Sequence, residues 1–339
     1  MEFNKSNRFN NENEKEEKPN LIHYKGKIGE FDYDPNIWEI NLYSYLEFKN
    51  KEVESLPKNL ELPKGCINIS YMFFNCKNLK NISPLNIWDT SNVKDMSFIF
   101  SHCEKLTDIT PLQNWDTSKV EYMSNTFYNC ANLTDISPLE NWDTSNVKDM
   151  SYMFYYCESL TDITPIQNWN ISKVKNISYM FEFCYTLTDI SPLQKWNTSK
   201  IESMLSMFRF CRNLKDITSL QNWDTSRVED MSYMFEKCVN LTDISPLQDW
   251  DTSNVTNMSS MFEYCKNLTD IYPLRNWDTS NVINMSRMFK YCENLTDISP
   301  LQNWDTSSVK DMSGMFKYCS NLTDESPIEN WDTSNVIFR

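Results

Sequence analysis

Apolar residues recur along most of this chain at a fixed offset of 27 residues. Two residue types mark this repeat in each of ten copies, one tryptophan and one cysteine. The tryptophans are Trp88, Trp115, Trp142, Trp169, Trp196, Trp223, Trp250, Trp277, Trp304 and Trp331, and the cysteines are Cys76, Cys103, Cys130, Cys157, Cys184, Cys211, Cys238, Cys265, Cys292 and Cys319. Because no insertion disturbs the register, we expect each copy to form one coil of a repeat solenoid, stacked on near-identical neighbours.

Within one copy, apolar residues come at about every third position. The pattern of one copy is Val147, Met150, Met153, Phe154, Cys157, Leu160, Ile163, Ile166 and Trp169. Neither the period of a strand nor one long helix explains it, so short elements joined by turns are expected. A serine that can cap a helix precedes Met-Phe in most copies. We predict a β-solenoid coil with a strand at Val-x-x-Met, a short helix or 3₁₀ turn at x-Met-Phe-x-x-Cys, and a strand at Leu-Thr-Asp-Ile. The spacing of residues 147–160 also fits one helix face, and periodicity leaves that alternative open.

Turn residues mark two corners in each copy. A proline such as Pro165 follows Leu-Thr-Asp-Ile in nine copies, and we expect it to end the second strand because it removes a ladder donor. The tryptophan is followed by Asp-Thr-Ser-Asn, as at residues 143–146, whose side chains bond their own backbone in turns.

Stacking would convert every recurring residue into a column along the solenoid axis. We expect the tryptophans to pack in the core, since an exposed row of indoles would form a large apolar patch; a row of ligand platforms is the alternative. Disulfides are disfavoured between the cysteines, because neighbouring Cβ vectors in a column run parallel. No Cys-x-x-Cys pair suggests zinc. Reduced, buried thiols, typical of a reducing compartment, are expected.

Aspartates form two further columns, one after the tryptophan and one in Thr-Asp-Ile. Such rows repel themselves, and a calcium ion between coils would relieve the repulsion. Asn170 and Asn197 replace two of these aspartates without disturbing the pattern, which favours turn capping over calcium.

Composition narrows the possible chemistry. Lys+Arg of 32 against Asp+Glu of 47 leaves a net charge of −15, so the basic stripe of a nucleic-acid binder is missing. With 4 glycines, glycine-rich phosphate loops cannot be assembled. His23 and His102 stand in no metal-ligand or nucleophile spacing. We expect no catalytic residue, metal, cofactor or nucleic-acid partner. The sequence has no run of 18 apolar residues and no apolar signal-peptide core, so we expect no membrane span and favour a cytoplasmic location, with the cell surface as the alternative.

The motifs Phe-x-x-Cys-x-x-Leu and Trp-Asp-Thr-Ser-Asn-Val, within the unit from Leu241 to Cys265, closely resemble the BspA-like bacterial surface-protein repeats. These repeats are relatives of leucine-rich repeats, and the resemblance covers about residues 66–339. It implies a leucine-rich-repeat-like solenoid with a role in adhesion or protein binding, and offers no catalytic residues to carry over. The chain departs from exported members of the family, since it lacks a signal peptide and lipobox.

The ten copies differ most after Met-Ser, after Phe and after Cys, and we expect those side chains to face solvent. In three successive copies they are unusually aromatic. We predict a protein-contact surface at Tyr152, Tyr155, Tyr156, Tyr179, Phe183, Tyr185 and Phe210, because clustered Tyr and Phe are effective anchors. The alternative is that these aromatics are scattered and form no patch.

Three segments are expected: a disordered polar tail at 1–20, a non-repeat cap at 21–65 and about ten repeats at 66–339. A non-enzymatic scaffold for protein–protein interaction is the favoured function. The alternatives are a surface adhesin exported by a non-standard route and an enzyme hidden in the cap.

Overall fold

The structure, a computed structural model, describes residues 53–338, all within one compact unit, Tyr45–Arg339. The predicted tail at 1–20 and most of the predicted cap at 21–65 lie outside the described residues. The part of the cap from 53 to 65 packs on the first coil. Leu56 and Leu60 are buried there, and the indole N–H of Trp88 donates to the Leu60 carbonyl at 3.0 Å.

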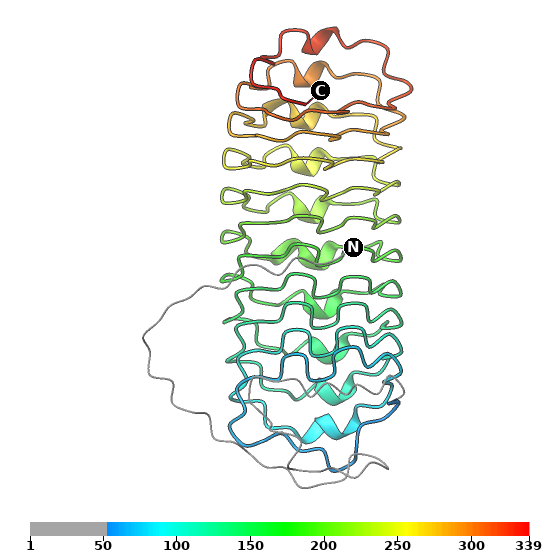
Figure 1. Cartoon of the computed structure of the whole chain (residues 1–339), viewed down its shortest axis with the longest axis vertical. Helices are drawn as coiled ribbons and strands as arrows, with labels where there is room; N and C mark the ends of the chain where they lie inside the picture. Colours follow the sequence, from blue (N-terminus) through cyan, green and yellow to red (C-terminus); the bar gives the residue numbers. More distant parts are fainter. Residues whose placement is uncertain (1–52, 339) are drawn as a thin grey trace, which may run out of the picture. The chain divides into compact units, whose positions relative to one another are not determined.

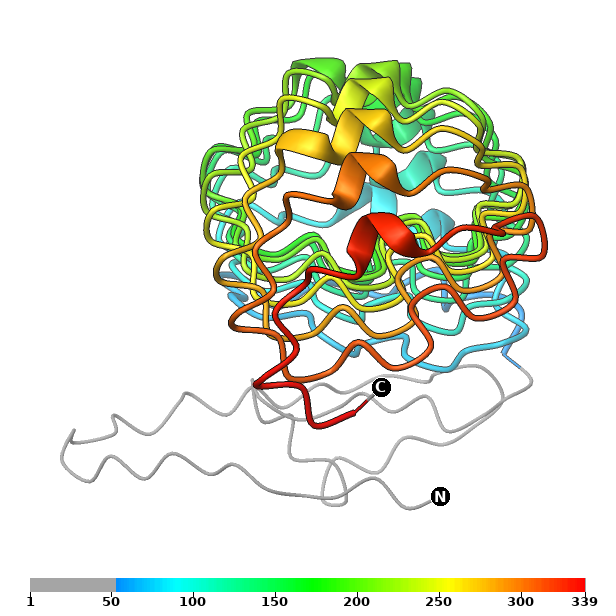
Figure 2. The same ribbon diagram turned by 90° about the horizontal axis from the view of Figure 1, so that it is seen from above.

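The predicted repeat solenoid is confirmed as a stack of coils (Figure 1). Each coil of the described region carries one short 3₁₀ helix, and Figure 2 shows these helices gathered on one side of the stack. The helices are η1 (Ser83–Ile87), η2 (Thr110–Leu112), η3 (Ser137–Leu139), η4 (Thr164–Ile166), η5 (Ser191–Lys195), η6 (Thr218–Leu220), η7 (Ser245–Leu247), η8 (Tyr272–Asn276), η9 (Ser299–Leu301) and η10 (Ser326–Ile328).

The position predicted for the helix was wrong. It forms at Ser/Thr-Pro-Leu, where we expected only a corner, and x-Met-Phe-x-x-Cys is a run of turns. Proline stands in the first turn of every helix of residues 53–338 except η6. The fixed φ of proline suits the first turn of a helix. The absence of an N–H costs nothing there, because an N–H at that position would have no partner within the helix. The single long helix over 147–160 does not form either.

The predicted strands are not confirmed, because parallel pairing between coils in the described residues is limited to isolated bridges such as Asp149↔Asn176. Alternate N–H groups point in different directions. Those of Tyr152 and Phe154 bond carbonyls of the next coil at 2.9 and 3.0 Å, whereas those of Met153 and Tyr155 close local turns at 3.3 and 3.1 Å. The local turns break the continuous ladder that a strand requires.

The tryptophans pack in the core, as predicted. Trp142 is 3% exposed, and its indole N–H donates to the Leu112 carbonyl of the preceding coil at 3.2 Å. Its ring lies parallel to that of Trp115, with centroids 6.4 Å apart. A second, fully buried column of phenylalanines runs beside the indoles, with Phe127 and Phe154 stacked at 5.8 Å.

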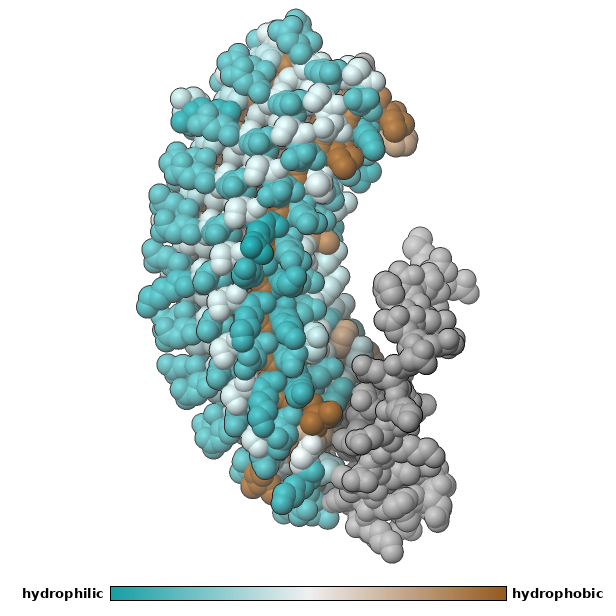
Figure 3. Space-filling model, turned by 90° about the vertical axis from the view of Figure 1, so that its left-hand side faces the viewer, coloured by the Kyte–Doolittle hydropathy of each residue, from teal (hydrophilic) through white to brown (hydrophobic). Residues whose placement is uncertain are grey.

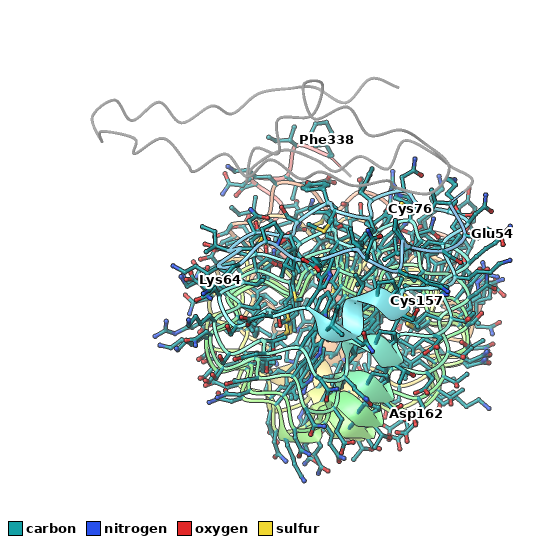
Figure 4. The ribbon with its side chains drawn as sticks, turned by 90° about the horizontal axis from the view of Figure 1, so that it is seen from below. Glu54, Lys64, Cys76, Cys157, Asp162 and Phe338 are labelled. Atoms are coloured by element: carbon teal, nitrogen blue, oxygen red, sulfur yellow. The ribbon has the colours of Figure 1, made fainter. Side chains whose placement is uncertain are left out.

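The cysteines of the described region are free, buried thiols, as predicted. Cys157, labelled in Figure 4, donates its S–H to the Phe127 carbonyl of the preceding coil at 3.2 Å. Burial raises its pKa to about 12, so the thiol stays protonated at neutral pH.

Both aspartate columns cap turns. Oδ1 of Asp143 accepts from the Ser145 N–H at 2.9 Å, and Oδ1 of Asp162, beside the 3₁₀ helices in Figure 4, accepts from the Thr164 N–H at 2.8 Å. Asn170 accepts from the Ser172 N–H at 3.1 Å in the same way. An amide oxygen therefore performs the same capping, which explains why asparagine is tolerated in the column.

Candidate functional site

The seven aromatic residues singled out in the sequence lie together in one connected group. All are half-buried, and each ring contacts at least one other of the group. The members are Tyr152, Tyr155, Tyr156, Tyr179, Phe183, Tyr185 and Phe210. The closest pairs join successive coils, with ring centroids 4.2 Å apart for Tyr152 and Tyr179 and 4.4 Å apart for Phe183 and Phe210. An arrangement of scattered, unconnected aromatics does not occur here.

Sequence reasoning missed one member of this group. Tyr128, one coil earlier, stacks on Tyr155 at 4.5 Å and touches Tyr152 at 6.1 Å. The repeat itself could have identified Tyr128, because it stands 27 residues before Tyr155 and therefore at the same position of the preceding coil. We call these eight residues the aromatic cluster.

Backbone conformation explains how the rings come into register. Tyr152 and Tyr156 have φ of 58°, in the left-handed region, and Tyr179, Phe183 and Phe210 have φ of 62–63°. The same two positions are left-handed in neighbouring coils. For a bulky residue this conformation costs roughly 1–2 kcal/mol. Because Tyr156 N–H bonds the Glu182 carbonyl of the next coil at 2.8 Å, inter-coil bonding helps to hold this backbone.

The cluster continues as a longer file of rings that the sequence reasoning also missed. One aromatic per coil stands at Tyr156, Phe183, Phe210, Tyr264, Tyr291 and Tyr318, with Lys237 in the gap. Tyr264 and Tyr291 stack at 4.1 Å, and Tyr291 and Tyr318 at 4.4 Å. Nζ of Lys237 lies 4.3 Å from the Phe210 ring centroid and 5.0 Å from that of Tyr264. We call this column, with its lysine, the aromatic file.

The residue after Phe does not face solvent in every coil, which corrects the prediction for the three coils with glutamate there. Glu182, Glu236 and Glu263 occupy this position and are 1%, 4% and 6% exposed. Arg209 bridges two of them, donating to Glu182 Oε1 at 2.9 Å and to Glu236. Lys290 holds Glu263 at 2.8 Å. Buried carboxylates need such partners, so a row of ion pairs lies beside the aromatic file.

Burial controls the protonation of this region. It raises the pKa of Glu182 to about 7, against the opposing effect of Arg209. Burial also raises the pKa of Tyr152 and Tyr155, and for Tyr155 the nearby charge of Glu182 adds to the effect. The tyrosine hydroxyls therefore remain protonated at neutral pH and are available as hydrogen-bond donors.

The described residues contain neither a metal-binding group nor a membrane-spanning helix. Among residues 53–338, no group of three or more His, Cys, Asp or Glu side chains is arranged to hold a metal ion. No helix in that part of the chain is long and apolar enough to cross a membrane. Figure 3 shows one side of the stack, where hydrophilic side chains cover most of the surface.

A family model described as "Mycoplasma protein of unknown function, DUF285" matches residues 67–192, 184–297 and 240–338. No curated protein matches the chain. The successive matches overlap and together run through the repeats, in accord with the 27-residue period.

Similar solved structures include three bacterial proteins. A leucine-rich-repeat protein of Eubacterium ventriosum is 19% identical over 78% of this chain and 65% of its own, with a TM-score of 0.39. A leucine-rich cell surface protein of Faecalibacterium prausnitzii is 18% identical, with coverages of 76% and 77% and a TM-score of 0.33. An internalin of Listeria monocytogenes is 16% identical, with coverages of 85% and 86% and a TM-score of 0.29. Likeness at this level does not extend to function.

Proposed function

This chain belongs to the family described as Mycoplasma protein of unknown function, DUF285, and on that premise we propose that it is a non-enzymatic scaffold for protein–protein interaction. The BspA-like, leucine-rich-repeat character predicted from its motifs is confirmed. A stack of coils supports the proposal, because a solenoid presents a long continuous face to a partner.

The observation that carries the proposal is the aromatic cluster. Eight half-buried Tyr and Phe side chains from four successive coils form one connected patch. Such residues bury large area at little cost in side-chain entropy, which makes them effective anchors in protein interfaces. We assign the partner-binding role to this patch.

The stacking within the patch favours a protein partner. In the pairs Tyr152–Tyr179 and Tyr128–Tyr155, one ring covers the face of the other. Ring edges and hydroxyl groups are left to meet a partner, and these suit the mixed apolar and polar contacts of a protein interface. A platform for stacking nucleobases would need free ring faces.

A pull-down from a lysate of the source cells tests the proposal. The baits are the parent chain, the variant Tyr155→Ala/Tyr156→Ala/Phe183→Ala, and a matched control, Ile87→Ala/Tyr272→Ala/Ile283→Ala, which removes three exposed apolar side chains elsewhere. We expect the control to recover the same proteins as the parent and the cluster variant to lose them. Recovery of identical proteins by all three baits would contradict the assignment.

Site-specific crosslinking gives an independent readout. A photoreactive benzoylphenylalanine is introduced in place of Tyr156 in one chain and in place of Tyr272, on η8, in another. We expect partner crosslinks from the first position and none from the second. Equal crosslinking from both would place the contact outside the aromatic cluster.

The same proposal assigns parts of the chain to roles. Residues 66–339 form the binding solenoid, with 21–65 as its cap and 1–20 as a polar tail. The free buried thiols fit a reducing compartment, which supports action inside the cell over display as an adhesin. Cell fractionation with an antibody against the chain distinguishes the two locations.

A further inference from the structure

Three cationic side chains surround one ring at the edge of the aromatic cluster. The guanidinium carbons of Arg209 and Arg212 lie 5.0 and 5.6 Å from the Phe210 ring centroid, and the ammonium of Lys237 lies 4.3 Å from it. The Arg212 guanidinium also lies 5.1 Å from the ring of Tyr185. Contacts of this kind hold a cation in place without neutralising its charge.

The three cations differ in what else they contact. Arg209 is engaged by two buried carboxylates, Glu182 and Glu236. No salt bridge in the described part of the chain involves Arg212 or Lys237. Both side chains therefore keep their N–H donors free for an external acceptor.

The charge of this spot is opposite to that of the whole protein. The chain carries a net charge of −15, yet three cations surround Phe210, and the two carboxylates Glu182 and Glu236 pair with only one of them, Arg209. Those two carboxylates are buried, whereas Arg212 is exposed and Lys237 half-exposed. An approaching ligand meets the two unpaired cations and the apolar edges of Phe183 and Phe210.

We propose that Arg212 and Lys237, on either side of Phe210, bind an acidic peptide segment of the partner. Carboxylates of the peptide accept hydrogen bonds from the guanidinium and the ammonium, and its aliphatic carbons rest on the two phenylalanine rings. Because the rings already orient the cations, little side-chain freedom is lost on binding. The charge pairing adds specificity and speeds association. This inference rests on the proposed function and names the chemistry of the partner.

An acidic peptide fits the site better than a nucleic acid does. Nucleic-acid binding draws its affinity from many phosphate contacts, and two unpaired cations on a chain of net charge −15 supply few. Phe183 and Phe210 are also packed against each other at 4.4 Å, which leaves little room for a base between them. Single-stranded nucleic acid is therefore the competing ligand that the test must include.

Fluorescence anisotropy with the full chain tests the inference. The probes are labelled hexaglutamate, hexaglutamine and a single-stranded oligonucleotide. We expect hexaglutamate to bind, to weaken as salt is added, and to bind more tightly than either other probe. Arg212→Gln/Lys237→Gln should weaken hexaglutamate binding about tenfold or more, since both charge contacts are lost.

Two further variants guard against a general charge effect and against misfolding. Lys94→Gln/Lys105→Gln changes the net charge equally at exposed lysines several coils away from the ring and should bind as the parent does. Arg212→Lys/Lys237→Arg keeps both charges and should retain most of the binding. Equal loss in both Gln double variants, or tighter binding of hexaglutamine or the oligonucleotide, would overturn the inference. If these fail while the cluster variant still loses its partners in the pull-down, the proposed function stands without this ligand assignment.

Discussion

Arg209 donates from Nη1 to Oε1 of Glu182, one coil away, at 2.9 Å, while Oε2 of the same carboxylate is buried without a hydrogen-bond partner among the described residues. A half-satisfied, buried carboxylate is held more easily when protonated. This agrees with the pKa of Glu182, raised to about 7 by burial.

The first prediction is a pH dependence of stability that originates at Glu182. Its folded-state pKa of about 7 exceeds the ordinary value of 4.5, so the stabilisation from protonation is fully present below pH 4.5 and is lost as the pH rises through 7. Between pH 4.5 and 7 the free energy of unfolding of the parent protein should fall by about 1–3 kcal/mol more than that of Glu182→Gln. Urea titrations below and above this window measure the difference, with exposed Glu140→Gln as control. Parallel pH profiles for parent and Glu182→Gln would contradict it.

The second prediction concerns η6, the one 3₁₀ helix of the described region without proline. Ser219 stands at the proline position, and its buried hydroxyl has no partner. Ser219→Pro should raise the free energy of unfolding by about 1 kcal/mol or more, because it restricts the unfolded chain and removes the unsatisfied hydroxyl. Ser219→Ala removes the hydroxyl without restricting the unfolded chain, so it measures the effect of the hydroxyl alone. If the proline variant is less stable than the parent, the Ser219 N–H makes a hydrogen bond that proline cannot make.

The third prediction tests the left-handed backbone positions. Ser206 has φ of 56° and is buried. Ser206→Gly should be more stable than Ser206→Ala by about 1 kcal/mol, because glycine adopts this conformation without strain. At Ser151, where φ is not positive, the order should reverse. Thermal or urea unfolding of the four variants decides the matter, and the same order at both sites would rule the explanation out.

The fourth prediction follows from the indole hydrogen bonds. Trp142→Phe removes one of the two donors to the Leu112 carbonyl, which keeps the Trp115 N–H at 3.1 Å, and it also removes buried ring area, so it should cost about 1–3 kcal/mol of unfolding free energy. Circular dichroism during urea unfolding gives the value. A cost near zero would mean that neither the indole hydrogen bond nor the lost ring area contributes to stability.

The fifth prediction concerns the thiols. Burial raises the pKa of the buried cysteines, to about 12 for Cys157, so native protein should react very slowly with a thiol reagent. Unfolding in guanidinium should release all 11 thiols of the chain. Rapid reaction of several thiols in the native protein would show that the coils separate readily.

The stack of coils and its core could be predicted from the sequence, because a residue repeated at a fixed offset must contact its own copies. Trp142 and Cys157 were assigned correctly for this reason. The place of the 3₁₀ helix could not, since a spacing of about three suits both a helix and a series of turns. Pro165 was interpreted as a stop, although the same ring is equally suited to start a helix.

The aromatic cluster was predicted in part, and its surroundings were missed for physical reasons. Tyrosine at positive φ is uncommon, so no residue preference marks Tyr152 as left-handed. Glu182 was expected at the surface because the position after Phe varies among the ten copies. Its carboxylate pairs with Arg209, which stands at the same position of the next copy, 27 residues later, and this alternation of charge within one column is visible only when the copies are aligned.

The indole and thiol donors of the core point toward the preceding coil, whereas buried threonine hydroxyls such as that of Thr144 donate to the following coil. From Trp115 onward each indole N–H, and from Cys103 onward each thiol, donates to a carbonyl 30 residues earlier. A newly made coil leaving the ribosome therefore meets acceptors that are already in place on the coil before it. During synthesis, the indole and thiol of each new coil can therefore bond at once to the coil made before it, while the threonine and backbone donors of that earlier coil wait for the acceptors that the new coil brings.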